Sequence, residues 1–90
     1  MYKISATNKF KKDLKTILKR GYNLNLLDEV VTKLSKGESL PIKNKDHSLS
    51  GNYAGKRECH ITPDWLLIYE TEEDALYLYL MRTGTHSDLF

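Results

Sequence analysis

The sequence predicts an α+β domain in which an N-terminal strand and a two-helix hairpin pack on an antiparallel meander sheet. Two patterns lead to this prediction. Apolar residues recur at helical spacing between residues 8 and 35, and they alternate with a period of two between residues 56 and 81. Because 90 residues are enough for one core and too few for two, residues 1–90 are expected to form a single domain.

The first elements are expected to be a strand at Tyr2–Ser5 and a helix at Asn8–Arg20, with Ser5 or Thr7 as the helix N-cap. Four apolar residues are spaced to lie on one face of this helix: Phe10, Leu14, Ile17 and Leu18. The rest of the helix surface is basic and carries Lys9, Lys11, Lys12, Lys15, Lys19 and Arg20. Such a surface is either a solvated helix face or a binding surface for the phosphates of a nucleic acid.

A second helix is expected at Asn25–Ser35, after a short link at residues 21–23, and Gly37 should end it. Its apolar residues also recur at helical spacing, so the two helices should form a hairpin on one face of the sheet. A polar connection, Glu38–Asn52, follows. Connections of this length in compact domains are often functional.

Three strands are expected in the C-terminal half, at Lys56–Ile61, Trp65–Thr71 and Ala75–Met81. The links between them are short, so neighbouring strands should pair in antiparallel fashion. The middle strand is apolar on both faces and should therefore be central. In the third strand, Tyr77 and Tyr79 should lie on the open face of the sheet, where they either pack on their neighbours or stack on bases.

The composition is that of a folded protein without membrane-spanning segments. Apolar residues make up 40% of the chain, the net charge is +2, and no run of about 18 apolar residues occurs. The N-terminus lacks the apolar region of a signal peptide, so a cytoplasmic location is expected. The single cysteine, Cys59, cannot form an internal disulfide, and the side chain is expected to act as a small buried hydrophobic group.

The strand directions of the meander bring several polar side chains to one edge of the sheet. The first strand ends at His60, and the second begins next to Asp64. The third strand ends near Arg82, shortly before His86. The position of His47 does not follow from the topology, because the segment after it could run in either direction.

Histidines converging in this way are suited to cleaving RNA without a metal ion. A pair of histidines can supply a base for the 2′-hydroxyl and an acid for the leaving 5′-oxygen. Asp64 could orient a histidine ring or act as the base itself. Arg57 and Arg82 are candidates for contacting the phosphate, because the guanidinium group forms a planar pair of donors.

Two other interpretations of these residues remain open at this point. Each histidine taken alone would be interpreted as a hydrogen-bonded surface residue. Two histidines and a carboxylate could also bind a transition metal. The H-x-x-x-D spacing across a turn, without a cysteine ligand or a helical H-E-x-x-H motif, is only a weak signal for a metal site.

Three separated motifs resemble a known family. They are K-D-H-S-L-x-G-x-Y at Lys45–Tyr53, R-E-C-H-I-x-P-D-W-L-L-I-Y at Arg57–Tyr69 and R-T-G-T-H-S-D-L-F at Arg82–Phe90. Together they resemble the YafQ-type toxins of the RelE-like superfamily, and the resemblance extends over the whole chain. It implies a RelE-like fold, which agrees with the meander and the helix hairpin predicted above.

The resemblance also implies a function and a set of site residues. YafQ-type toxins belong to bacterial type II toxin-antitoxin systems and cleave mRNA in the ribosomal A site. The residues that match their functional positions are His47, His60, Asp64, His86 and Phe90. Their implied roles are acid-base chemistry for the histidines and Asp64, and positioning of RNA for Phe90. Trp65 and Arg82 lie beside these positions and are expected either to support RNA binding or to shape the site, and for Trp65 a packing role is the favoured interpretation.

Partners follow from the same resemblance. An antitoxin is expected to wrap the domain, in a heterotetramer of two toxins and two antitoxins, and to bind the operator DNA of the complex. Ribosomal RNA becomes the expected target of the basic first helix, in particular of Lys11, Lys12 and Lys15. No cofactor, metal or membrane is expected. The alternative function is a non-catalytic module that inhibits translation by binding the ribosome or RNA.

Overall fold

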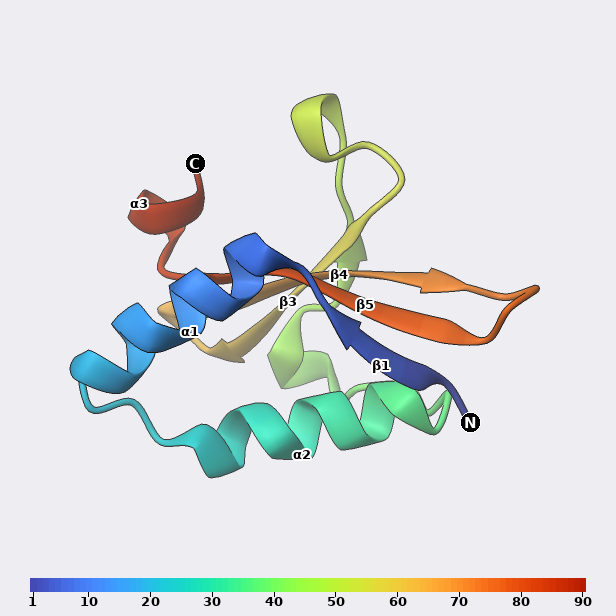
Figure 1. Cartoon of the computed structure of the whole chain (residues 1–90), viewed down its shortest axis with the longest axis horizontal. Helices are drawn as coiled ribbons and strands as arrows, with labels where there is room; N and C mark the ends of the chain where they lie inside the picture. Colours follow the sequence, from blue (N-terminus) through green and yellow to red (C-terminus); the bar gives the residue numbers. More distant parts are fainter.

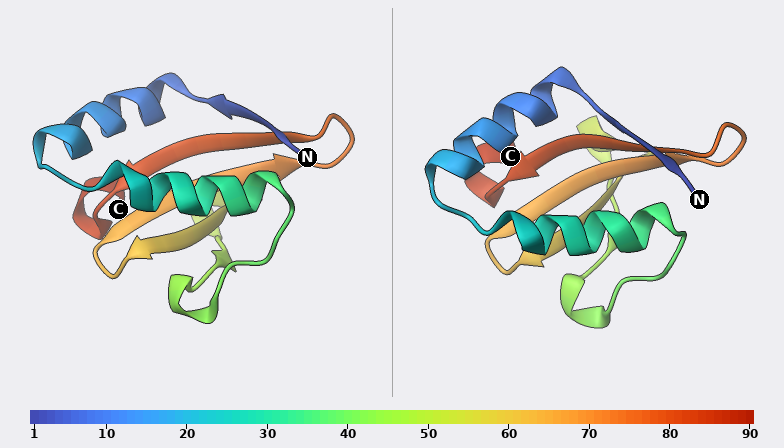
Figure 2. Two further views of the ribbon diagram at one scale, coloured as in Figure 1. Left: turned by 90° about the horizontal axis from the view of Figure 1, so that it is seen from below. Right: turned by 60° about the horizontal axis from the view of Figure 1, so that its bottom comes forward.

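The computed structural model describes all 90 residues as a two-layer domain of the predicted α+β class. Two helices cover one face of a five-stranded sheet with the order β1-β5-β4-β3-β2. Figure 1 shows α1 and α2 on one side of the sheet, whereas α3 and the segment between β2 and β3 project from the other side. Figure 2 shows α2 lying across the covered face of the sheet. None of the helices has the length and apolar content needed to cross a membrane.

The N-terminal elements follow the prediction closely. Strand β1 spans Lys3–Ala6, helix α1 spans Asn8–Lys19 and helix α2 spans Leu24–Ser35. Of the two candidate caps for α1, Thr7 is the one used, because its side chain accepts a hydrogen bond from the backbone amide of Phe10 at 3.0 Å. Strand β1 lies at one edge of the sheet and pairs in parallel with β5, the last strand of the chain.

The meander is confirmed, with small changes in its boundaries. Strand β3 spans Arg57–Thr62, β4 spans Trp65–Glu72 and β5 spans Tyr77–Gly84, and the neighbouring pairs are antiparallel. Strand β4 is central, as its two apolar faces predicted. The predicted third strand began too early. Leu76 has a φ of 55° in the β4–β5 turn, and the strand begins at the next residue and continues to Gly84.

The two faces of the sheet carry cores of different size. The helix-covered face holds a cluster of 11 buried residues, which includes Ile17, Trp65 and Leu67. The open face holds a smaller cluster of Leu66, Ile68 and Leu89, with Leu89 contributed by α3. One residue departs from the predicted helix face, since Leu18 is 48% exposed at the end of α1. The functional side chains described below lie around the smaller cluster.

The long polar connection contains short elements that the sequence did not predict. They are the 3-10 helix η1 at Ile42–Asn44, strand β2 at His47–Ser48 and the 3-10 helix η2 at Gly51–Tyr53. The buried Asn44 fixes this segment to the sheet, because its side-chain amide donates a 2.7 Å hydrogen bond to the carbonyl of His60. A four-residue helix, α3, spans His86–Leu89 at the C-terminus.

Candidate functional site

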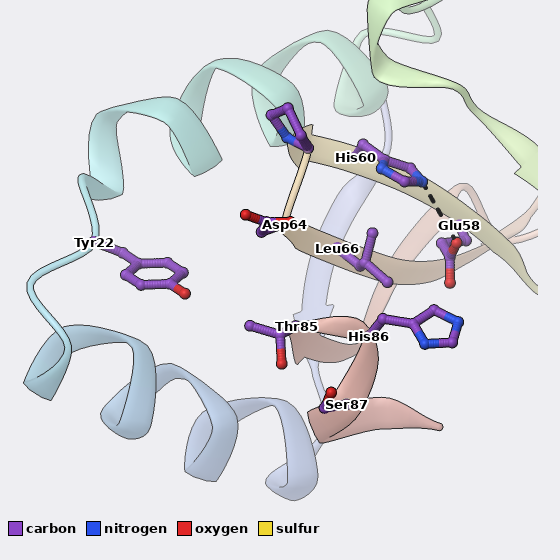
Figure 3. Close-up of a pocket in the computed structure, with 9 residues that line it drawn as sticks. Tyr22, Glu58, His60, Asp64, Leu66, Thr85, His86 and Ser87 are labelled. Atoms are coloured by element: carbon purple, nitrogen blue, oxygen red, sulfur yellow. Dashed lines mark ion pairs between the residues drawn. The ribbon is translucent and has the colours of Figure 1, made fainter.

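An open cavity lies on the sheet face that the helix hairpin leaves uncovered, at the end where β3 turns into β4. It has a volume of about 520 Å³ and is lined by Tyr22, Glu58, His60, Pro63, Asp64, Leu66, Thr85, His86 and Ser87. Figure 3 shows His60 and Glu58 on one strand and His86 on the neighbouring α3, with Leu66 between them at the base of the cavity. Three of the predicted site residues, His60, Asp64 and His86, therefore share one cavity.

Strand pleating explains why Glu58 and His60 face this cavity. Side chains two residues apart in a strand point to the same face. Cys59, between them, is fully buried in the helix-covered core. Burial raises the pKa of its thiol to about 12, so Cys59 is the small buried group that the sequence predicted.

Pairing of β2 with β3 brings His47 next to Glu58, although His47 itself does not line the cavity. His47 is the direct cross-strand partner of Glu58. Its Nδ1 lies 2.6 Å from the carbonyl oxygen of Lys45. Because a carbonyl can only accept, Nδ1 carries a proton and Nε2 of the neutral ring has a free lone pair. That Nε2 lies 3.5 Å from Oε1 of Glu58.

Glu58 is the residue that sequence reasoning missed. Its side chain is 7% exposed, and Oε1 lies 3.5 Å from Nε2 of His47 and 3.9 Å from Nε2 of His60. Its other oxygen, Oε2, is buried without a hydrogen-bond partner. A buried, unpartnered carboxylate oxygen is costly for folding. Its position between two imidazoles points to a role in the site.

Helix α3 positions His86 and Phe90. Thr85 and Asp88 form a capping box, in which the Thr85 amide donates to Asp88 Oδ2 at 2.9 Å and the Asp88 amide donates to Thr85 Oγ1 at 3.2 Å. Gly84 allows this close turn, since a Cβ there would come within 2.9 Å of Asp88 Cβ. The rings of His86 and Phe90 stack with centroids 4.9 Å apart.

An ion pair ties α3 to the end of α1. Arg20 donates from Nη1 and Nη2 to the two carboxylate oxygens of Asp88, at 2.6 and 3.1 Å. The hydrogen bond from Arg20 is the main reason why the pKa of Asp88 lies well below its usual range, and the Thr85 amide lowers it further. Asp88 thus supports the segment that carries His86, although it does not contact the cavity.

Replacing Asp88 with asparagine is expected to lower the Tm by about 2–5 °C at neutral pH, because the pair is partly exposed. The folded-state pKa of Asp88 is lowered, so its contribution is complete above the unfolded value of about 3.9 and is lost as the pH falls from there towards the folded value. Thermal unfolding of both proteins between pH 7 and pH 2 should show a constant Tm difference down to about pH 5 that narrows below about pH 4.

The control for this comparison is Ser87→Ala, which changes an exposed neighbour in the same turn. It should leave the Tm unchanged. A Tm difference between wild type and Asp88→Asn that stays constant through pH 3 would contradict the role given to the carboxylate charge.

Asp64 lies at the rim of the cavity, in the turn between β3 and β4, and its side chain is exposed. No hydrogen bond or ion pair joins it to His60 or His86. Figure 3 shows Asp64 displaced along β4 from the histidine rings, on the side of Tyr22. It can reach a ligand in the cavity, but it does not orient a histidine in this structure.

The two candidate arginines are held by carboxylates outside the cavity. Arg82 donates from Nε and Nη2 to Asp13 of α1 at 2.7 and 3.1 Å, and its side chain is 23% exposed. The hydrogen bond with Asp13 is the main cause of its raised pKa, and Tyr53 makes a smaller contribution. Arg57 donates to Asp46 at 3.3 Å. Neither arginine lines the cavity that contains His60 and His86, which is called the histidine cavity below.

Trp65 is a core residue and does not form part of an RNA surface. It is 1% exposed, and its Nε1 donates a 2.8 Å hydrogen bond to Oγ1 of Thr83. The expected contact of Trp65 with RNA is therefore wrong, and the packing interpretation agrees with its burial. Lys11, Lys12 and Lys15, by contrast, are exposed on α1 as predicted.

Solved structures of high similarity identify the class of protein. A metal-bound toxin from Helicobacter pylori superposes with a TM-score of 0.94 at 44% identity, with full coverage of both chains. The toxin in the Escherichia coli DinJ–YafQ complex superposes with a TM-score of 0.89 at 37% identity, over 100% of this chain and 99% of that one. The fold is therefore that of a small bacterial toxin of the RelE-like class.

Sequence comparison identifies the family. Residues 2–90 match the family described as "Bacterial toxin of type II toxin-antitoxin system, YafQ". The mRNA interferase toxin YafQ of Escherichia coli strain K12 is 39% identical over 88 residues, which cover 97% of this chain and 94% of that protein. The chain belongs to the YafQ family of type II toxins.

Proposed function

We propose that this protein is a ribosome-dependent endoribonuclease that cleaves mRNA in the ribosomal A site and thereby inhibits translation. One observation carries the proposal: His60 and Asp64, near the β3–β4 turn, and His86, from the C-terminal α3, line one open cavity. The similar proteins of Escherichia coli are named mRNA interferase toxins, which supports the same activity for this chain.

The base in this reaction comes from the β2–β3 side of the cavity. In the neutral form of His47 the lone pair lies on Nε2, since Nδ1 donates to the Lys45 carbonyl. This Nε2 can accept the proton of a 2′-hydroxyl. His60, on the adjacent strand, is the second candidate for the same step. The imidazolium formed on either ring is stabilised by the Glu58 carboxylate, which lies within 4 Å of both.

The acid comes from the opposite side, on α3. His86 faces the cavity across Leu66, so a phosphate between the strand and α3 would have a base on one side and an acid on the other. The 2′-oxygen forms a bond to phosphorus while the bond from phosphorus to the 5′-oxygen breaks. His86 donates a proton to that oxygen, which leaves a 2′,3′-cyclic phosphate and a 5′-hydroxyl. Asp64, at the rim, assists proton transfer or contacts the ribose.

Binding to the ribosome is assigned to the exposed lysines of α1. Lys11, Lys12 and Lys15 present charge to solvent and can neutralise phosphates of ribosomal RNA. Arg82 and Arg57 keep donor groups beyond those paired with Asp13 and Asp46, and these can contact the message. The protein would act in the bacterial cytoplasm and would require no cofactor.

An antitoxin is the expected partner, because a similar toxin has been solved in complex with the antitoxin DinJ. A heterotetramer of two toxins and two antitoxins is the proposed assembly. Operator DNA would be bound only through the antitoxin.

The experiment is an in vitro translation reaction on a defined message, with new 5′ ends mapped by primer extension. Wild-type protein should produce ends at A-site codons when ribosomes are present and should leave free message intact. One arm contains a chelator that is selective for transition metals over Mg²⁺, because a similar toxin was crystallised with bound metal and the ribosome itself requires Mg²⁺. Cleavage should continue in that arm.

Other outcomes assign other functions. Intact message together with blocked translation would indicate an inhibitor that binds the ribosome without cleaving RNA. The basic surface of α1 would be sufficient for that function. Loss of cleavage in the chelator arm, with recovery on adding back metal, would overturn the acid-base assignment.

A further inference from the structure

A second cavity lies beside the histidine cavity, between the η2 segment and α3. Its volume is about 590 Å³, and it is lined by Lys9, Ser50, Asn52, Tyr53, Leu89 and Phe90. Cavities of about 300–1,000 Å³ accommodate small organic groups such as a nucleoside. The lining combines aromatic rings, polar side chains and a cation, and none of the acid-base groups lies in it.

Aromatic contacts connect the two cavities. Phe90 stacks on His86 with centroids 4.9 Å apart, and its edge meets Tyr53 with centroids 5.6 Å apart at 73°. Phe90 is 55% exposed, so it is accessible to a ligand bound in this cavity. A planar group bound beside Tyr53 and Phe90 would therefore lie next to the imidazole that we propose as the acid.

The remaining lining groups match the other parts of a nucleotide. Ser50 and Asn52 are exposed, and no side-chain hydrogen bond occupies either of them, so both can bond to the edge of a base. Lys9 can pair with a backbone phosphate. Arg82 adds positive charge at this side, because it lies close enough to Tyr53 for the tyrosine to affect its pKa.

We propose that this cavity binds a nucleobase of the message next to the scissile phosphate, with Tyr53 and Phe90 as stacking residues and Asn52 as a reader of the base edge. The inference rests on the proposed nuclease function and adds a source of nucleotide preference to it. Stacking on Tyr53 accepts any base, whereas hydrogen bonds to Asn52 distinguish among them.

The first test measures binding without cleavage. A short single-stranded RNA with a 2′-deoxy substitution at the cleavage position is titrated into isotopically labelled protein, and NMR shifts are followed. The largest changes should occur at Tyr53, Phe90 and Asn52. Tyr53→Ala should weaken binding by about 5- to 100-fold, whereas Tyr53→Phe should bind normally, since stacking needs only the ring. Shifts confined to α1, or equal affinity for Tyr53→Ala, would overturn the inference.

The second test uses ribosomes and a message library that samples every nucleotide around the cut. Tyr53→Ala should raise KM with little change in kcat, and Asn52→Ala should flatten the nucleotide preference at one position. The control is Tyr79→Ala, which removes an aromatic ring of the open face that stacks on Tyr77, outside both cavities. If Asn52→Ala keeps the wild-type nucleotide preference, Asn52 does not read the base edge. If wild type binds the RNA as described but cuts no message, the nuclease proposal fails and the binding site remains.

Discussion

Replacing His86 with alanine is expected to slow cleavage of ribosome-bound message by about 10²–10⁴-fold, the usual contribution of one acid-base group. The side chain is exposed, forms no hydrogen bond, and contacts the fold mainly by stacking on Phe90. Its removal should therefore leave the Tm unchanged. Single-turnover cleavage with saturating toxin measures the chemical step, and a ribosome pelleting assay measures binding in parallel.

Two matched variants separate chemistry from binding in this experiment. Ser87→Ala changes the next residue, which also lines the cavity, and should retain full activity. Lys11→Glu combined with Lys15→Glu reverses charge on the exposed surface of α1 and should weaken ribosome binding without affecting the single-turnover rate at saturation. A His86→Ala protein that loses ribosome affinity as strongly as it loses cleavage would make His86 a binding contact.

The layered fold was predictable because its signals are periodic over many residues. The alternation from Trp65 onwards has to place one set of side chains against the helices, and the apolar character of both faces makes β4 central. By contrast, β2 has two residues and α3 has four, and elements this short have no period to detect. Their positions come from tertiary contacts such as the Asn44 hydrogen bond to β3.

The candidate site was predictable in part for the same reason. Strand direction alone predicted that His60, Asp64 and His86 lie at one edge of the sheet, and in the structure they line one cavity. It could not place His47, whose position depends on the pairing of β2 with Glu58. It also placed Arg82 at this edge, but it could not predict that Asp13, 69 residues away in the chain, holds this arginine outside the cavity.

Glu58 left a signal in the sequence that was not used. If Cys59 faces the core, then Glu58 and His60 must share the opposite face. A carboxylate two residues from a candidate catalytic histidine, on the same face of a strand, should be examined as its partner. The prediction treated only the turn residue Asp64 in this way.

Replacing Glu58 with glutamine is expected to increase stability and decrease activity. The amide has nearly the shape of the carboxylate but no charge, so it removes the cost of burying a charge there, although it still lacks a hydrogen-bond partner. The same change removes the negative charge within 4 Å of His47 and His60, and with it the stabilisation of an imidazolium on either ring. At these distances the loss corresponds to about a 10- to 100-fold lower rate of cleavage.

The two measurements are the Tm and the single-turnover rate, compared with Glu70→Gln as a control. Glu70 lies on the neighbouring strand β4 and lines neither cavity. A higher Tm together with slower cleavage in Glu58→Gln alone would mean that the fold tolerates an unfavourable buried charge because the histidines need it. If the cleavage rate and the Tm both fall, Glu58 stabilises the fold, and its effect on cleavage is indirect. If neither the Tm nor the cleavage rate changes, His47 and His60 do not depend on Glu58, and its unpartnered Oε2 has no role in catalysis.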